Sequence, residues 1–249
     1  MKPEIVVRPN PNELIRIAAR RFGQLAHRAV ASRGRCSVAL SGGSTPGPLY
    51  QLLTEEPYRT QIPWAQVHLF WGDERCVPPD DPDSNYRMAH ETLIARVPIP
   101  PGNVHRMRGE LAPEAAARAY EHELQEFFCG PRTRFDLVLL GLGTDGHTAS
   151  LFPGSMALDE RGRLAVAVTA QYEDRPAHRV TLTLSAINTA RYVWFLVSGS
   201  AKAESVRTVL EGPTKGLPAQ LVQPMTGQLT WFLDAEAASQ LKQRGATLD

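Results

Sequence analysis

The amino-acid sequence predicts an α/β fold in which helices cover a mostly parallel β-sheet. Short apolar runs of strand length alternate with segments of helical periodicity, which is typical of parallel strands joined by crossover helices. Three of the apolar runs end in glycine-rich or polar turns. Ligands of such sheets bind beyond the carboxyl ends of the strands, so we expect the three turns to converge on one site.

The first half of the chain is predicted to open with a long helix over residues 12–33. Leu14, Ile17 and Leu25 recur at helical spacing among arginines. Pro11 suits the first turn of a helix, and Gly34 suits its end. After it we expect a strand over residues 36–40, a helix ending near residue 53, a strand over 67–71, and helices over 85–96 and 113–128.

The second half continues the alternation. A buried strand over residues 135–140 runs into Gly141. Further strands are expected over residues 164–168, 180–184, 192–197 and 229–233, and helices over 201–210 and 235–244. No shift in composition or internal repeat divides the chain, so we expect a single domain over residues 1–249.

The composition is globular and excludes several classes of partner. The chain has 249 residues, of which 43% are hydrophobic and 21% charged, enough to bury a large core. With 27 basic and 26 acidic residues, it has no overall field to attract nucleic acid or an anionic membrane. We therefore expect neither as a partner, and a local site for any anion.

The cysteines and the termini favour a cytoplasmic protein. Cys36, Cys76 and Cys129 are odd in number and form no C-x-x-C pair, which argues against a disulfide framework and a zinc site. The start of the chain lacks the apolar stretch of a signal peptide, and no run approaches the roughly 18 apolar residues of a membrane span. We expect a monomer or a small homo-oligomer.

The first turn, Ser41-Gly-Gly-Ser-Thr-Pro46, has the character of a phosphate cradle. The glycines Gly42 and Gly43 allow close backbone approach to an anion, and Ser44 and Thr45 add hydroxyl donors at the start of a helix. An ordinary capped turn is the alternative. Pro46 rules out the G-x-S-x-G pattern, and no Gly-Lys pair of a Walker A loop follows.

The second turn, Trp71-Gly-Asp-Glu-Arg75, offers groups suited to a polyhydroxyl substrate. Asp73 can accept hydroxyl protons, and Arg75 can meet an oxygen or a phosphate. A solvated loop with an internal ion pair is the alternative. The aspartates of residues 80–83 lack the full pattern of a calcium loop, so we expect no metal ion.

The third turn, within residues 141–154, presents Asp145 and His147 two residues apart. Its first six residues match the dinucleotide pattern G-x-G-x-x-G, but Phe152-Pro-Gly154 interrupts the helix that such a site requires. Histidine is a natural general base, because its usual pKa of about 6.5 leaves it mostly neutral at neutral pH. A structural histidine is the alternative.

Two cations follow later in the chain. Arg179 opens a predicted strand, and Lys202 lies in a turn between a strand and a helix. Either is suited to phosphate, Lys202 as a point charge and Arg179 as a bidentate fork. Plain surface charge is the commoner role of both residue types.

Three motifs in this order closely resemble those of the 6-phosphogluconolactonase family across most of the chain. They are residues 41–46, residues 71–75 with Ser84-Asn-Tyr86, and residues 141–153. The resemblance implies a single three-layer α/β/α domain of modified Rossmann-like type that opens a phosphorylated sugar lactone without a cofactor. It further implies His147 as base with Asp145 orienting it, and Arg179 and Lys202 as phosphate-binding cations.

A related family, the glucosamine-6-phosphate deaminases, is the second hypothesis. These proteins carry a glutamate five residues beyond the histidine, where this chain has Phe152, and typically a tyrosine where it has Arg75. Both differences favour the lactonase. A sugar-phosphate sensor without catalytic activity is the third hypothesis, but no DNA-binding segment is evident to support it.

Overall fold

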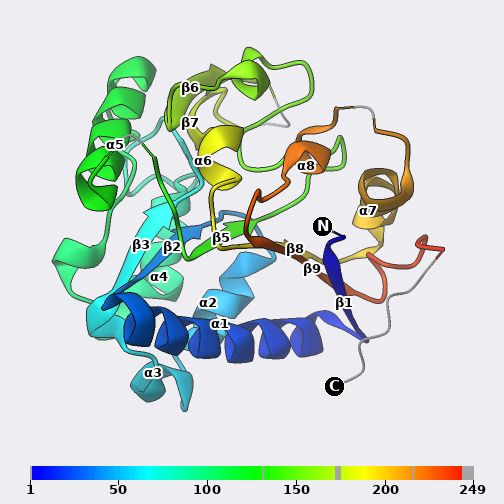
Figure 1. Ribbon diagram of the computed structural model, residues 1–249, viewed down its shortest axis with the longest axis horizontal. Coiled ribbons are helices and arrows are strands. Elements are labelled where there is room, and N and C mark those ends of the chain that lie inside the picture. The colour runs from blue at the N-terminus through cyan, green and yellow to red at the C-terminus, as the bar shows by residue number, and fades with distance from the viewer. Residues whose placement is uncertain (1, 131, 172–174, 215, 243–249) are drawn as a thin grey trace.

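The computed structural model describes residues 2–130, 132–171, 175–214 and 216–242. Its centre is a six-stranded sheet with the order β1-β9-β8-β5-β2-β3, and every neighbouring pair of strands is parallel (Figure 1). The strands are β1 (Glu4–Arg8), β2 (Cys36–Leu40), β3 (Val67–Trp71), β5 (Leu137–Leu140), β8 (Tyr192–Val197) and β9 (Gln228–Asp234). The predicted parallel sheet is confirmed.

The strand order reverses direction between β2 and β5. From β2 the chain adds β3 on one side, whereas β5, β8 and β9 extend the sheet on the other side. The loops that leave β2 and β5 therefore diverge, and a crevice opens between them at the carboxyl ends of the strands. The first and third predicted turns follow these two strands directly.

Helices lie on both sides of the sheet. Figure 1 shows α1 (Pro11–Arg33) and α2 (Pro46–Leu53) on one side, and α5 (Pro113–Phe128) and α6 (Leu184–Ile187) on the other. Helix α1 begins where Asn10 Oδ1 accepts a 3.0 Å hydrogen bond from the Glu13 amide, and it ends at Gly34 with φ 73°. The layered α/β/α class is confirmed.

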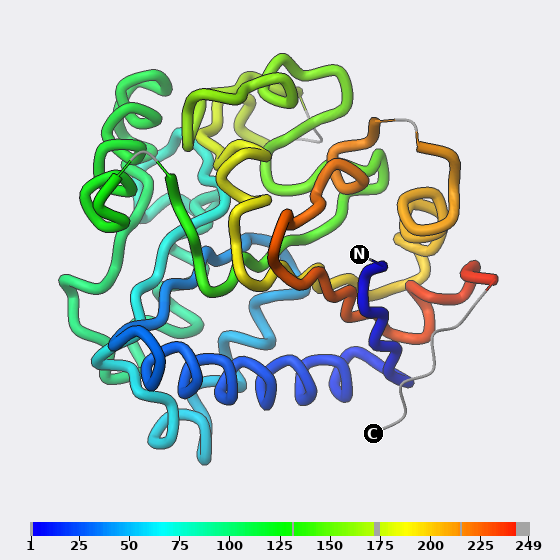
Figure 2. Tube along the Cα trace, viewed as in Figure 1, coloured from blue at the N-terminus to red at the C-terminus, as the bar shows by residue number. Residues whose placement is uncertain are grey.

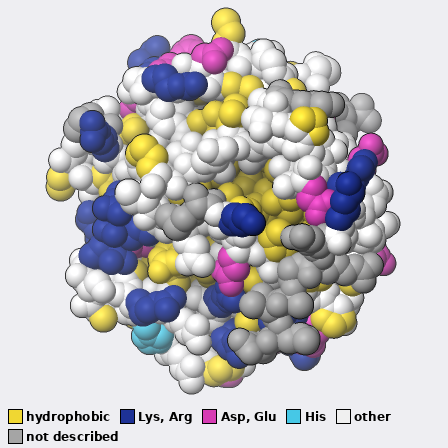
Figure 3. Space-filling model, turned by 45° about the vertical axis from the view of Figure 1, so that its right-hand side comes forward, with side chains coloured by type: hydrophobic (Ala, Val, Ile, Leu, Met, Phe, Trp, Pro, Cys, Tyr) yellow, Lys and Arg dark blue, Asp and Glu magenta, His cyan; other side chains and the backbone are white. Residues whose placement is uncertain are grey.

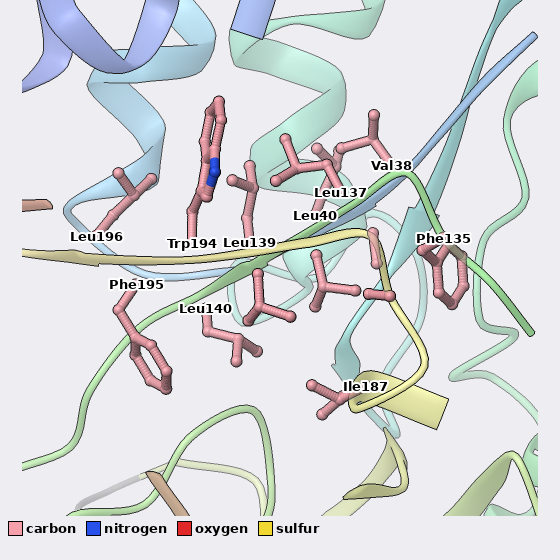
Figure 4. Close-up of a cluster of buried hydrophobic side chains, with 14 of the residues drawn as sticks. Val38, Leu40, Phe135, Leu137, Leu139, Leu140, Ile187, Trp194, Phe195 and Leu196 are labelled. Carbon is pink, nitrogen blue, oxygen red and sulfur yellow. The ribbon is translucent and has the colours of Figure 1, made fainter. Parts of the chain in front are cut away.

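The middle strands are buried on both faces. Side chains of β5 and β8 point to opposite sides of the sheet and pack into the two helical layers, as Figure 4 shows for Leu139 and Trp194 on one side and Leu140 and Phe195 on the other. All four are at most 3% exposed. Polar and apolar residues do not alternate along such strands, because both faces of the sheet are shielded from water. This explains why the sequence showed continuous apolar runs rather than alternating ones.

A second, three-stranded antiparallel sheet has the order β4-β7-β6. Its strands are β4 (Asp73–Arg75), β6 (Ala165–Thr169) and β7 (His178–Leu182), and α5 packs against β6 and β7. The strands expected over 164–168 and 180–184 therefore exist, shifted by one or two residues, but outside the parallel sheet. The polar turn expected at residues 72–75 is partly a strand, because β4 pairs with β7 from Asp73 to Arg75.

Two of the remaining helices were predicted, α4 (Asn85–Thr92) and α7 (Ala203–Glu211). The short helices α3 (Tyr58–Gln61) and α8 (Pro218–Leu221) were not predicted. Helix α4 ends four residues earlier than expected, before the 3-10 turn Ile94–Arg96. The helix expected over 235–244 is wrong as far as residue 242, where the chain forms turns; residues 243–244 lie outside the described residues. The main chain here closes separate turns, with hydrogen bonds from the Ser239 amide to the Glu236 carbonyl and from the Leu241 amide to the Ala238 carbonyl, in place of a helical ladder.

The chain begins and ends its described course on one edge of the molecule. Strand β1 pairs with β9 there, so segments from the two ends of the sequence lie side by side (Figure 2). No helix in the described part of the chain is both long and apolar enough to cross a bilayer. Figure 3 shows charges of both signs dispersed around a hollow that hydrophobic side chains line.

Candidate active site

A cleft with a volume of about 320 Å³ lies at the carboxyl ends of β2, β5 and β8. It collects all eight residues that the sequence predicted to bind substrate, together with His147. These residues are Gly42, Gly43, Ser44, Thr45, Asp73, Arg75, Arg179 and Lys202. Asp145 does not line the cleft but contacts His147 from behind. Segments separated by more than a hundred residues thus meet in one place.

The glycine turn after β2 owes its shape to a close neighbour. A Cβ atom on Gly42 would overlap the side chain of Asn85, which lines the cleft and donates a 2.9 Å hydrogen bond to the main-chain oxygen of Asp73. Gly43 has φ 102°, a conformation that side chains disfavour. Thr45 directly precedes α2, and both Thr45 and the first residue of the helix, Pro46, line the cleft.

Two buried tyrosines fix the ends of the strands that lead into the cleft. The hydroxyl of Tyr50, on α2, accepts a hydrogen bond from the amide of Ser41 at 3.0 Å and donates one to its carbonyl at 2.8 Å. Tyr120, on α5, makes the same pair of bonds to Trp71 at the end of β3, at 2.9 and 3.0 Å. Burial raises the pKa of both hydroxyls, so they stay protonated donors.

His147 and Asp145 form a hydrogen-bonded pair. The distance from His147 Nδ1 to Asp145 Oδ1 is 2.6 Å, and the same oxygen accepts a 3.0 Å bond from the His147 amide. Burial lowers the pKa of His147 below 6.5, and the Asp145 carboxylate opposes part of this shift. Burial raises the pKa of Asp145, but its hydrogen bonds and attraction to His147 outweigh that and hold it below its usual range. The arrangement therefore favours a neutral imidazole beside an ionised carboxylate.

Gly143 makes room for this pair. A Cβ atom at residue 143 would overlap His147 Nδ1 and would lie 2.6 Å from Asp145 Oδ1. The main-chain amide of Gly143 also donates a 2.8 Å hydrogen bond to the His147 carbonyl, which closes the turn. The glycine of the third motif is thus required by the two side chains that follow it.

Phe152 lies between the imidazole and a buried cation. Its ring centroid is 4.5 Å from that of His147, and the Arg179 guanidinium carbon lies 5.4 Å from it on the ring face. Phe152 is 8% exposed and Arg179 is 3% exposed. The phenyl ring thus excludes water beside both groups, which contributes to the lowered pKa of His147.

One face of the second sheet forms a wall of the cleft. Arg75 on β4 lies directly opposite Arg179 on β7, and Asp73 lies opposite Thr181 in the same register. Two like charges in directly opposed positions destabilise a sheet. Arg75 Nε and Arg179 Nη2 are also buried without a hydrogen-bond partner among the described residues. Such an arrangement leaves both guanidinium groups suited to an anion in the cleft.

Ser150 joins the histidine turn to this wall. Its Oγ donates to Asp73 Oδ2 at 2.6 Å, and its amide donates to Thr181 Oγ1 at 3.3 Å. Glu74, on the opposite face of β4, accepts bonds from Ser84 Oγ and from the amides of Asn85 and Tyr86, and so holds the start of α4. The side chains of Asp73, Glu74 and Ser150 are all buried.

Several lining residues were absent from the predicted set. Asn85 and Thr148 lie within the recognised motifs but were given no role, whereas Ser198 and Arg175 lie outside them. Ser198 Oγ is 3.2 Å from Thr45 Oγ1, which links the β8 loop to the glycine turn. Among the described residues, no group of three or more His, Cys, Asp or Glu side chains is placed to hold a metal ion.

Comparison with known families agrees with this geometry. The sequence profile of the family described as glucosamine-6-phosphate isomerases/6-phosphogluconolactonase matches residues 9–231. The chain belongs to this family. A 6-phosphogluconolactonase of Synechocystis sp. is 43% identical over 97% of this chain and 100% of its own length. One of Mycobacterium leprae is 39% identical over 97% of this chain and 99% of its own.

Solved structures show the same relationship. The 6-phosphogluconolactonase from Trypanosoma cruzi superposes with a TM-score of 0.86 at 33% identity, covering 97% of this chain and 98% of its own. A monomeric glucosamine-6-phosphate deaminase superposes with a TM-score of 0.81 over 95% of this chain and 99% of its own, at 24% identity. The second likeness shows the fold alone.

Proposed function

We propose that this protein hydrolyses 6-phospho-D-glucono-1,5-lactone to 6-phospho-D-gluconate, a step of the oxidative pentose phosphate pathway. Full-length similarity to 6-phosphogluconolactonases supports the substrate class. The observation that carries the mechanism is the 2.6 Å contact between His147 and Asp145 at the edge of a cleft lined by cations. Free thiols at all three cysteines fit the reducing cytoplasm, where we place the reaction.

The phosphate of the lactone binds, in this proposal, among the amides of Gly42 and Gly43, Ser44, Thr45, Arg179 and Lys202. The start of α2 adds the positive end of its dipole to this region. Held at its phosphate, the substrate presents its lactone carbonyl carbon to His147. Binding energy at one end of the substrate then lowers the entropic barrier at the other.

Neutral His147 acts as the general base. Its Nδ1 donates to Asp145, which sets the tautomer so that Nε2 accepts a proton from the attacking water. As the water oxygen bonds to C1, the carbonyl electrons move onto their oxygen. That intermediate collapses when the bond from C1 to the ring oxygen breaks, and the ring oxygen takes the proton back from the imidazolium. Asp145 stabilises the charged imidazole between the two steps.

Phe152 favours hydrolysis over the deaminase reaction. A glutamate at this position serves proton transfer in glucosamine-6-phosphate deaminases, and a phenyl ring cannot exchange a proton. Here the ring instead packs against His147 and Arg179. The same cleft thus keeps a base for water and loses the second acid that ring opening of an amino sugar needs.

A direct comparison of two substrates tests the proposal. Purified protein is given 6-phosphogluconolactone, with ring opening followed directly, and glucosamine 6-phosphate, with ammonia release followed in parallel. We expect turnover of the lactone above its spontaneous rate and no ammonia release. Ammonia release would favour the deaminase, and binding of either sugar phosphate without turnover would favour a sensor.

A further inference from the structure

Arg175 enters the cleft from the segment that precedes β7, outside every motif of the sequence. Its Nη1 forms an ion pair of 2.5 Å with Asp83 Oδ1. The side chain of Arg175 is 48% exposed and that of Asp83 is 28% exposed. Ion pairs this open to water typically contribute little to stability, so this contact is easily given up.

The backbone of Asp83 is also held by hydrogen bonds, one of them from a residue that lines the cleft. Its main-chain oxygen accepts a 2.5 Å hydrogen bond from Arg75 Nη1, and its amide donates to Asp81 Oδ1 at 2.8 Å. The backbone of Asp83 therefore stays in place whether or not its carboxylate is engaged. Arg75 thus binds the main chain of Asp83, and Arg175 binds the side chain of the same residue.

The cleft carries an excess of positive charge at this end. Arg75, Arg175, Arg179 and Lys202 all line it, whereas Asp73 is its single lining carboxylate among the described residues. Burial lowers the pKa of Arg179; Asp73 raises it, and the charges of Arg75 and Arg175 lower it. The three guanidinium groups are therefore close enough to repel one another. A phosphate dianion relieves that repulsion better than the single charge of Asp83.

We propose that Arg175 is a phosphate-binding residue that exchanges Asp83 for the phosphate of the bound sugar. Its guanidinium fork meets two phosphate oxygens, a stronger contact than the exposed carboxylate pair. Asp83 then acts as a built-in competitor, which occupies Arg175 in the empty cleft and recaptures it when product leaves. The inference rests on the proposed function, because it assumes a phosphorylated substrate in this cleft.

Binding of inorganic phosphate, measured by titration calorimetry, tests the exchange without any turnover. We expect Arg175→Gln to weaken phosphate binding about tenfold or more, as expected for a lost charged hydrogen bond. Asp83→Asn should tighten it a few-fold, by roughly the strength of an exposed ion pair. The double variant should resemble Arg175→Gln. Arg16→Gln is the matched control, since Arg16 forms an exposed ion pair with Glu13 on α1 and should change nothing.

The kinetic counterpart uses 6-phosphogluconolactone beside the unphosphorylated lactone. Arg175→Gln should raise KM more than it lowers kcat, and should reduce the preference for the phosphorylated lactone about tenfold. Unchanged phosphate affinity in Arg175→Gln, weaker binding in Asp83→Asn, or a parent protein that binds no phosphate at millimolar concentration would each overturn the inference. If the parent binds phosphate as expected but opens no lactone, the proposed function fails while the exchange stands.

Discussion

Ser150 Oγ lies 2.6 Å from Asp73 Oδ2, and this buried hydrogen bond ties the turn that carries His147 to the second sheet. We expect Ser150→Ala to lower the free energy of unfolding by about 1 to 3 kcal/mol, because a buried carboxylate oxygen loses its donor. The activity should fall as well, since the turn becomes less firmly placed. Chemical denaturation and lactone kinetics measure both effects. Ser32→Ala, at the exposed end of α1, is the control, and equal stability of the two variants would contradict the prediction.

Removal of the proposed base should cost most of the activity. We expect His147→Ala to lower kcat/KM for 6-phosphogluconolactone about 10²- to 10⁴-fold, the usual contribution of general-base catalysis. The lactone must be followed directly, because spontaneous hydrolysis sets the background. His122→Ala is a suitable control, since His122 lies exposed on α5 with 72% of its side chain accessible. Near-normal turnover in His147→Ala would exclude the general-base role.

The pH profile should report the lowered pKa of His147. Burial holds this pKa below 6.5, and only the neutral form accepts a proton. The rate should therefore stay high as the pH falls to 6.5 and decline at lower pH. Asp145 raises the pKa of His147, so Asp145→Asn should move the inflection to still lower pH and also reduce kcat. An inflection that moves to higher pH in Asp145→Asn would show that another group controls the rate.

Substitution of Phe152 separates packing from electrostatics. Phe152→Leu removes the ring that lies 4.5 Å from the imidazole, so more water should reach His147 and its pKa should rise toward 6.5. The acidic limb of the rate profile should shift to higher pH, and KM should rise as Arg179 loses its support. Phe127→Leu, in the aromatic cluster around Phe70, serves as the control for destabilisation alone. The prediction fails if Phe152→Leu has the same pH profile as the parent protein.

The local patterns of the sequence predicted most of the scaffold and the chemical groups. Pro11 and Gly34 bound α1 as expected, and the glycine turns follow β2 and β5 at the reversal of strand order. These features depend on neighbouring residues along the chain, so they are visible without the fold. The pairing of Asp145 with His147 was also predicted, because two residues on a tight turn have few ways to lie apart.

Contacts across the sheet could not be predicted in the same way. Residues Asp73 to Arg75 are polar and have the composition of a loop, and only pairing with β7 makes them a strand. Tyr120 reaches Trp71 from 49 residues away, so no local pattern reveals the bond. Arg175 carries no motif, and its place in the cleft follows from the course of the chain before β7. The helix expected after Asp234 did not form, and the main chain closes separate turns there instead.

Gly143 offers a practical marker for reading genome sequences. Any other residue there would carry a Cβ atom into His147 Nδ1, so a chain with a substitution at this position cannot hold the imidazole against the aspartate as this one does. Homologues that keep the histidine and the aspartate but have lost the glycine should therefore retain the fold and lack catalytic activity. We expect such chains to bind sugar phosphates without turning them over.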